Sequence, residues 1–263
     1  MLDDCRENFI RSDSAGKDSL VPIIFILSWN RPIYLWVCLD SIFRNTKAKC
    51  KVVIADNNSN DPMVRSVISS FEERGLFYKV YSCLENDPFR LKQLVDLYWD
   101  EIGDYFVFIE SDIEIMPIKE SCWLSKFTEY MDLDEKLGIV GSRVYQDDFV
   151  SKGFAKEIRP GIDESDLDFL IKSKAPMRDC YDTSESLISP HNPPLRLLML
   201  RKKVYEKIGF GRDTQIHFRT IKEGYKSAIS TEVVHRHLSL LNIFDYYSYS
   251  GNHRDAFFDK QRK

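Results

Sequence analysis

Short apolar runs alternate with segments of helical periodicity through the first half of the chain. The run VPIIFIL at Val21–Leu27 is typical of a buried strand and ends in the polar sequence SWNRP. From Ile33 to Arg44 apolar residues recur with the period of a helix, and Pro32 suits its first turn. The same alternation predicts strands at Lys51–Ala55, Phe77–Cys83, Tyr105–Ile109 and Leu137–Val144, and helices from the N-cap Asp61 to about Arg74 and at Arg90–Glu101.

Strands that alternate with helices of this length indicate βαβ units. The expected fold class is therefore α/β, with a Rossmann-like, mostly parallel sheet flanked by helices. Ligands of such sheets bind beyond the carboxyl ends of the strands. Three of the predicted strands end in SWNRP, DNNSND and ESDIE, which are all polar. This coincidence predicts a ligand site at that edge of the sheet.

The regular pattern breaks near Tyr145 and resumes near Arg196. Residues 145–194 are charged and rich in turn-forming residues, so we expect an irregular insertion with one helix near Leu167–Ile171. A regular segment at Arg196–Leu200 follows, and helices are expected at Lys203–Ile208 and at Thr214–Glu223, the last ended by Gly224. We predict a single domain at 21–263, preceded by a flexible segment at 1–20 and closed by a tyrosine-rich extension at 238–263.

Charge and cysteine content narrow the classes of function. The net charge is −4, from 41 acidic and 37 basic residues, so the chain has no overall positive field that would attract a nucleic acid. None of the six cysteines forms a CxxC pair, which favours reduced thiols and a cytoplasmic protein. No apolar stretch is long enough for a transmembrane segment, and the N-terminus lacks the pattern of a signal peptide. Peripheral contact with the inner membrane face and oligomer formation both stay open.

Two acidic clusters follow predicted strands. Glu110 and Asp112 flank Ser111 directly after YFVFI, so their carboxylates face the same side of an extended chain and suit a cation such as Mg²⁺ or Mn²⁺. Solvated loop carboxylates are the alternative. Asp56 and the asparagines after it could accept hydrogen bonds from a nucleobase or ribose, or form a plain Asx-rich turn.

Two later motifs carry titratable groups. Asp213 stands at the start of a predicted helix, where it serves either as an N-cap or as a base that takes a proton from a hydroxyl. The sequence VVHRH contains His235 and His237. One imidazole could complete a metal site or touch a diphosphate, and structural histidines are the alternative.

In this order the motifs resemble those of the family 2 glycosyltransferases of the GT-A fold. They are FILSWNRPIYLWVCLDSI, KVVIADNNSND, YFVFIESDIEI, LLMLRKKVYEKIGFGRD, FRTIKEGYK and VVHRH. The resemblance implies transfer of a sugar, with inversion, from a nucleotide-sugar donor to a carbohydrate or glycoconjugate acceptor. It further implies a divalent metal, Mn²⁺ or Mg²⁺, UDP as the default nucleotide, and a place in polysaccharide or glycoconjugate synthesis.

The resemblance also implies roles for individual residues. Asp112 would bind the metal, with His235 as a second ligand and His237 as its substitute. Asp213 would be the general base, and residues 145–194 would shape the acceptor side. The donor would contact a set of residues near the strand ends: Ser28, Asn30, Arg31, Asp56, Asn58, Glu110 and Ser111.

Two residues depart from the family pattern. Glu110 replaces the usual first aspartate of the metal motif, and Arg212 replaces the glutamate before Asp213. Arg212 could weaken Asp213 as a base, or bind a negatively charged acceptor or phosphate. The alternative function is therefore a non-catalytic sugar-nucleotide-binding or scaffold protein of the same fold. A nucleotidyltransferase or a dehydrogenase is disfavoured because SWNRP lacks the glycines that their phosphate loops need.

Overall fold

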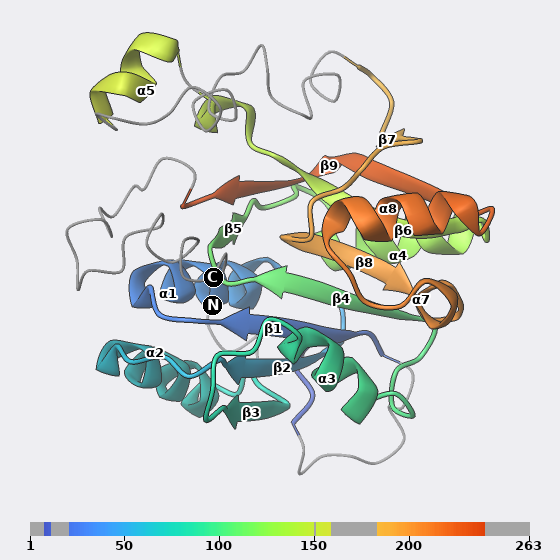
Figure 1. Cartoon of the computed structure of the whole chain (residues 1–263). Helices are drawn as coiled ribbons and strands as arrows, with labels where there is room; N and C mark the ends of the chain where they lie inside the picture. Colours follow the sequence, from blue (N-terminus) through green and yellow to red (C-terminus); the bar gives the residue numbers. More distant parts are fainter. Residues whose placement is uncertain (1–7, 12–20, 150, 159–182, 240–263) are drawn as a thin grey trace.

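A nine-stranded sheet forms the centre of the computed structural model, which describes residues 8–11, 21–149, 151–158 and 183–239 (Figure 1). Its strand order is β3-β2-β1-β4-β8-β6-β9-β5, and β7 pairs with β9. The strands are β1 (Ile23–Ser28), β2 (Lys51–Asp56), β3 (Lys79–Ser82), β4 (Tyr105–Glu110), β5 (Ile113–Ile115), β6 (Leu137–Val144), β7 (Leu187–Ile188), β8 (Leu197–Arg201) and β9 (Lys226–His237).

The sheet is mixed. Strands β3, β2, β1 and β4 are parallel, as the alternation of strands and helices predicted. Strand β8 lies antiparallel between β4 and β6, and β5 and β7 lie antiparallel to β9. The α/β class is thus confirmed. The first four strands are all parallel, and in the second half β6 and β9 are parallel neighbours among antiparallel pairs. An apolar pattern such as LLML shows that a strand is buried but not in which direction it runs.

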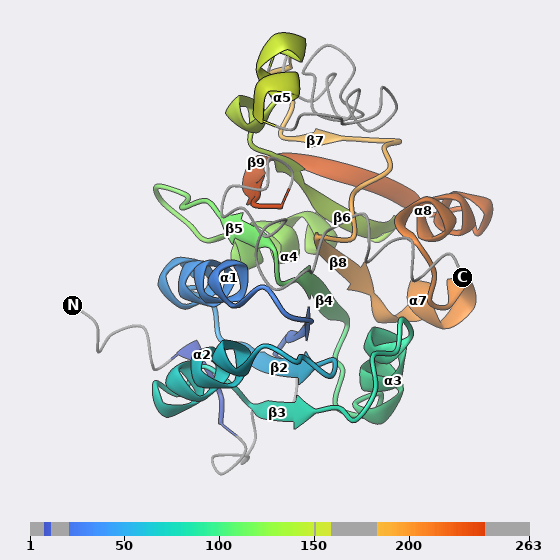
Figure 2. The ribbon, with the colours of Figure 1, turned by 60° about the vertical axis from the view of Figure 1, so that its left-hand side comes forward.

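Helices cover both faces of the sheet (Figure 2). One face carries α1 (Pro32–Asn45), α2 (Pro62–Glu73) and α4 (Trp123–Leu133), and the other carries α3 (Arg90–Leu97), α7 (Lys202–Ile208) and α8 (Asp213–Lys222). Alternate residues of β1 point to opposite faces of the sheet. Ile24 and Ile26 pack toward α1, whereas Ile23 and Phe25 pack toward α3. Outside these layers lie the short helices η3 (Gln146–Asp148) and α5 (Lys152–Ile158).

Several predicted segments fall partly or wholly outside the described residues. The helix expected at Leu167–Ile171 and nearly all of the extension at 238–263 lie there. Within the expected flexible segment at 1–20, residues 8–11 are attached to the sheet, because Phe9 forms a bridge with Cys50 and its ring stacks on Phe43 at 5.7 Å. No helix in the described part of the chain is both long and apolar enough to span a membrane.

Four described cysteines are free thiols, in agreement with the prediction. Cys38, Cys50 and Cys122 are buried and Cys83 is half-buried. Burial raises the pKa of the Cys38 and Cys50 thiols far above the usual range, so neither is a nucleophile near neutral pH. These residues act as small apolar side chains of the core.

The N-cap expected at Asp61 is present. Its carboxylate accepts a hydrogen bond of 2.9 Å from the Met63 amide at the start of α2. Replacing Asp61 by alanine should lower the free energy of unfolding by about 1 kcal/mol, because one amide of the first turn loses its partner. Urea denaturation measures this. The exposed Glu72 of the same helix is a matched control, and equal stabilities of Asp61→Ala and Glu72→Ala would contradict the cap.

Candidate active site

The polar ends of β1, β2 and β4 lie side by side. Ser28 pairs in register with Asp56, and Leu27, one residue earlier, pairs with Glu110. The strand that follows β1 in the chain, β2, lies on one side of β1 in the sheet, and β4 lies on its other side. A topological switch point therefore lies between β1 and β4. Such points are where open α/β sheets bind ligands. The structure therefore brings the three predicted loops together.

Asp112 occupies the turn between β4 and β5 and is contacted by polar side chains. Its Oδ2 accepts from the Ser239 hydroxyl at 2.6 Å and from Arg31 Nη1 at 3.2 Å, and it lies 3.5 Å from His237 Nε2. Its Oδ1 is buried and has no hydrogen-bond partner among the described residues. The described residues thus leave one oxygen of this carboxylate available to a ligand.

The pKa values of the two carboxyls of the acidic motif are shifted in opposite directions. Burial alone would raise the pKa of Asp112, but His237, Arg31 and Ser239 outweigh it and hold that pKa well below the usual range. Withdrawal from water raises the pKa of Glu110 to about 7, although 47% of its side-chain surface is exposed. Arg196 lowers this pKa, and the negative charge of Asp112 adds to the rise. Asp112 is therefore the permanent anion of the pair.

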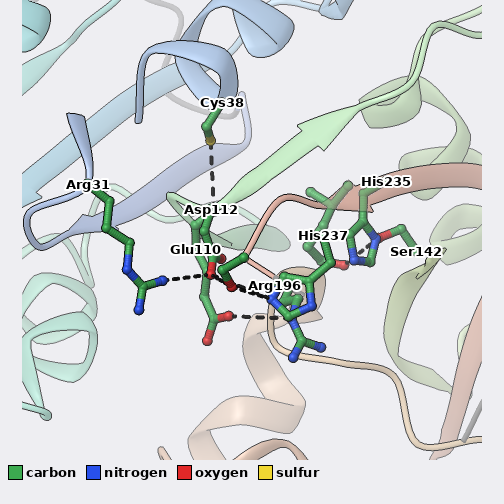
Figure 3. Close-up of polar contacts among 10 residues, drawn as sticks. Arg31, Cys38, Glu110, Asp112, Ser142, Arg196, His235 and His237 are labelled. Carbon is green, nitrogen blue, oxygen red and sulfur yellow. Dashed lines mark hydrogen bonds and ion pairs between the residues drawn. The ribbon is translucent and has the colours of Figure 1, made fainter. Parts of the chain in front are cut away.

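The pairing of β5 with β9 decides which histidine reaches Asp112. His237 lies opposite Ile113, and the Leu238 amide donates to the Asp112 carbonyl at 2.9 Å. His235 lies two residues earlier on β9, where its Nδ1 is 2.7 Å from the Ser142 hydroxyl (Figure 3). The structure thus places His237, rather than the expected His235, against Asp112.

His235 is fully buried, and its Nε2 has no partner in the described part of the chain. Burial lowers its pKa well below the usual value, and the nearby charge of Arg196 lowers it further. The ring is therefore neutral. It lies beside Asp112 and His237 and contacts Ser142 instead of the Asp112 carboxylate.

Arg196 lies beside Glu110 and His237 although no sequence motif pointed to it. It directly precedes β8, and its backbone carbonyl accepts from the Glu110 amide at 3.1 Å. Its Nε donates to His237 Nε2 at 3.1 Å and lies 3.9 Å from Glu110 Oε2. Arg31 and Arg196 approach the two carboxylates from opposite sides (Figure 3). Only the pairing of β8 with β4 reveals this position.

The loop after β1 is tied to the loop after β2. Asn30 is buried, and its Oδ1 accepts from the amides of Asn60 and Asp61 at 3.0 and 3.2 Å. The backbone amide of Asn30 donates to the Ser59 hydroxyl at 2.8 Å, and that hydroxyl donates to Asp56 Oδ1 at 2.5 Å. The predicted donor residues Asn30 and Asp56 are thus connected through Ser59.

The other predicted donor residues differ in exposure. Asn58 is exposed and has a positive φ of 66°. The neighbouring Asn57 is buried, and its backbone amide donates a hydrogen bond of 2.7 Å to the Ser28 carbonyl. The Ser28 hydroxyl is buried without a hydrogen-bond partner among the described residues. Ser111 is half-buried between the two carboxylates. Asn57 therefore shapes the loop, and Asn58 remains exposed to solvent.

Asp213 is the first residue of α8 and is half-buried. The N-cap position belongs to Arg212, whose backbone amide donates to Gln215 Oε1 at 3.1 Å. Asp213 is therefore not the N-cap. Its charge contributes to the raised pKa of Glu110, so its carboxylate lies within electrostatic range of the acidic motif. Arg212 is exposed at the same end of the helix.

The donor set suits a hard cation that also binds substrate oxygens. No group of three His, Cys, Asp or Glu side chains in the described residues converges as a complete metal site. Asp112 offers one unpartnered carboxylate oxygen, with the imidazole of His237 beside it. Mg²⁺ in particular is usually held by one or two carboxylates together with phosphates and water. The residues present fit such a cation.

Comparison with known proteins identifies the family. Residues 23–184, more than half of the 263-residue chain, match the family described as Glycosyl transferase family 2. The chain belongs to glycosyl transferase family 2. The match includes the loops after β1, β2 and β4, but it ends before Arg196, Asp213 and His237. No curated protein matches the chain by sequence.

Solved structures confirm the GT-A fold. GalNAc-T7 with UDP, GalNAc and Mn²⁺ superposes with a TM-score of 0.55 at 12% identity, over 84% of this chain and 44% of the other. The mannosyltransferase PcManGT from Pyrobaculum calidifontis, in complex with GDP-Man and Mn²⁺, gives 0.55 at 15% identity over 84% and 57%. TarS 1-349 of S. aureus gives 0.50 at 15% over 81% and 57%. The chain thus spans about half the length of these proteins.

Proposed function

We propose that this protein transfers a sugar, with inversion, from a nucleoside diphosphate donor to a hydroxyl of a carbohydrate or glycoconjugate acceptor. The observation that carries the proposal is Oδ1 of the ionised Asp112, which has no hydrogen-bond partner in the described part of the chain and lies beside His237 at the switch point between β1 and β4. A UDP-sugar is the proposed donor by family resemblance, and the proposed setting is polysaccharide or glycoconjugate synthesis in the cytoplasm.

The proposed cofactor is Mn²⁺ or Mg²⁺. Asp112 and His237 are the residues that would hold it, with His235 as the alternative ligand that the sequence pattern suggested. Two of the solved structures of similar fold contain Mn²⁺ together with UDP or GDP-Man, which supports this choice. A bound divalent cation neutralises the charge that develops on a departing diphosphate.

Asp213 is proposed as the general base. The acceptor hydroxyl attacks the anomeric carbon of the donor, and its proton passes to the Asp213 carboxylate. The bond between that carbon and the diphosphate oxygen breaks, and its electron pair leaves with the nucleoside diphosphate. The half-buried start of α8 is accessible to an acceptor and lies within electrostatic range of Glu110, which supports this role.

Two loops and two guanidinium groups are proposed to bind the donor. Asp56 accepts hydrogen bonds from the nucleobase or ribose, because its position at the end of β2 is held by Ser59. Arg31 and Arg196 flank the acidic motif and suit the oxygens of a diphosphate. Glu110 is left for the ribose or for a water on the cation.

A non-catalytic sugar-nucleotide-binding or scaffold protein is the second candidate. Arg212 favours it, because this exposed guanidinium stands beside the proposed base where the family pattern has a glutamate. The two candidates share donor binding and differ in turnover. A protein that binds a sugar nucleotide but transfers it to no acceptor and hydrolyses none would support the second.

A thermal-shift panel tests the proposed donor site. The protein is melted with UDP, GDP, dTDP and CMP, and with UDP-, GDP- and dTDP-sugars, each in Mn²⁺, Mg²⁺ or EDTA. A ligand that binds only the folded protein must raise its melting temperature, and at 100 times its Kd it stabilises by about 2.7 kcal/mol. We expect one nucleotide class to give a shift that EDTA removes. Equal melting temperatures in every condition would contradict the proposed donor site.

A further inference from the structure

The guanidinium of Arg31 forms an ion pair with the Asp112 carboxylate, which is proposed to hold the cation. Its Nη1 lies 3.2 Å from Asp112 Oδ2, and 20% and 15% of the two side chains are exposed. A divalent cation on Asp112 would therefore stand beside an existing positive charge. Two like charges at such short range repel, most strongly where little water screens them. Arg31 and the cation compete for Asp112.

The backbone aims Arg31 at this carboxylate. Asn30 and Arg31 both have positive φ angles, 52° and 53°, which non-glycine residues rarely adopt. Such a conformation persists only where its surroundings hold it. Here the Asn30 side chain binds the amides of Asn60 and Asp61, and its backbone amide binds Ser59, which in turn binds Asp56. The direction of Arg31 is thus set by the loop that also carries the proposed nucleoside ligand.

The diphosphate of a donor would offer Arg31 a second anion at the same place. A guanidinium group matches the geometry of phosphate oxygens and binds them in a bidentate manner. Arg31 directly precedes α1, a helix of 14 residues with no acidic residue in its first turn. The positive end of this helix favours an anion close to Arg31.

We propose that Arg31 is the internal counter-ion of Asp112 in the donor-free protein and that the donor's diphosphate draws it away. The inference rests on the proposed function and adds to it a positioning residue. Its consequence is positive coupling: the cation binds weakly alone and tightly together with a nucleoside diphosphate. Because coupling is reciprocal, the nucleotide gains the same factor from the cation.

Calorimetric titration with Mn²⁺, with and without saturating UDP, measures the coupling without any turnover. If the thermal-shift panel selects another nucleoside diphosphate, that one replaces UDP. In the absence of nucleotide, Arg31→Gln should bind Mn²⁺ roughly threefold to tenfold more tightly than the wild type, because Asp112 is no longer paired. The factor by which UDP strengthens Mn²⁺ binding should fall by at least as much, since the diphosphate loses its guanidinium partner.

Two further variants separate charge and geometry from general damage. Arg31→Lys keeps the positive charge, so its affinity for Mn²⁺ alone should stay near that of the wild type, while UDP should strengthen that binding less than in the wild type because an ammonium is not bidentate. Arg44→Gln removes an exposed arginine from the other end of α1, where it pairs with Asp40. The affinity of Arg44→Gln for Mn²⁺ should equal that of the wild type both with and without UDP.

The inference is overturned if Arg31→Gln binds Mn²⁺ alone no more tightly than the wild type, or if UDP strengthens Mn²⁺ binding equally in both. Those results leave the proposed function intact as long as the wild type binds Mn²⁺ and UDP together. A wild-type protein that binds neither overturns the proposed function as well. Circular dichroism of every variant shows whether the fold is retained. Should Arg31→Gln fail to fold, the altered UDP dependence of Arg31→Lys decides.

Discussion

Asp213→Asn is expected to reduce sugar transfer by about 10²- to 10⁴-fold, because an amide cannot take the proton of the acceptor hydroxyl. The affinity for the donor should stay near that of the wild type, since Asp213 lies at the start of α8 and not in the loops after β1 and β2. Initial rates at saturating donor and acceptor give the first quantity, and titration with UDP and Mn²⁺ gives the second. The loss should appear in kcat rather than in the Kd of the donor.

Glu223→Gln is the matched control. Glu223 is an exposed carboxylate at the opposite end of the same helix, so its replacement changes the charge equally but lies away from the site. Its turnover should equal that of the wild type. If Asp213→Asn were as active as this control, Asp213 would not be the base. Equal losses of turnover and donor affinity would instead assign Asp213 to donor binding.

Asp112→Asn should abolish the metal dependence of donor binding. The amide keeps the shape of the side chain but removes the charge that pairs with Arg31 and faces His237. Replacing a residue that only hydrogen-bonds to a metal ligand already lowers metal affinity by about 10- to 100-fold. Loss of the ligand Asp112 itself should therefore lower the affinity for Mn²⁺ by at least about 100-fold. Titration with UDP in Mn²⁺ and in EDTA should then give the same weak affinity.

Glu114→Gln provides the comparison for this change. Glu114 lies two residues beyond Asp112 on β5 and is directed to Arg236, 3.9 Å away, instead of to Arg31. Its donor affinity should retain the full dependence on Mn²⁺. A metal dependence that survives in Asp112→Asn would move the proposed cation site elsewhere. Melting curves without ligand show whether either protein has lost its fold.

Local patterns predicted most elements of the sheet and its flanking helices. Strand β6 has the predicted bounds Leu137–Val144, and α1 differs from its prediction by one residue at each end. Helix α4 at Trp123–Leu133 and strand β9 at Lys226–His237 were not predicted as elements. The sequence of β9, KSAISTEVVHRH, mixes polar and apolar residues, and its burial comes from pairing with β6, β5 and β7.

The sequence by itself determined the α/β class, the family resemblance and the acidic half of the site. Asp56 and Glu110 end the apolar strands β2 and β4, Asp112 comes two residues after Glu110, and the carboxyl ends of parallel neighbours in one sheet necessarily meet. The pattern of apolar and polar residues along the chain is therefore sufficient to predict that these carboxylates lie close together. Its motif also singled out Asp213, whose role as the base stays a prediction, but not the position of Asp213 relative to Glu110.

Only the tertiary structure decided which basic residues meet the carboxylates. Arg196 and His237 reach the carboxylates through the antiparallel pairing of β8 with β4 and of β9 with β5. A shift of this β5–β9 register by two residues would bring His235 in place of His237, because residues two apart on a strand point to the same side. Strand direction and register depend on contacts between residues far apart in the chain. Local periodicity carries no information about either.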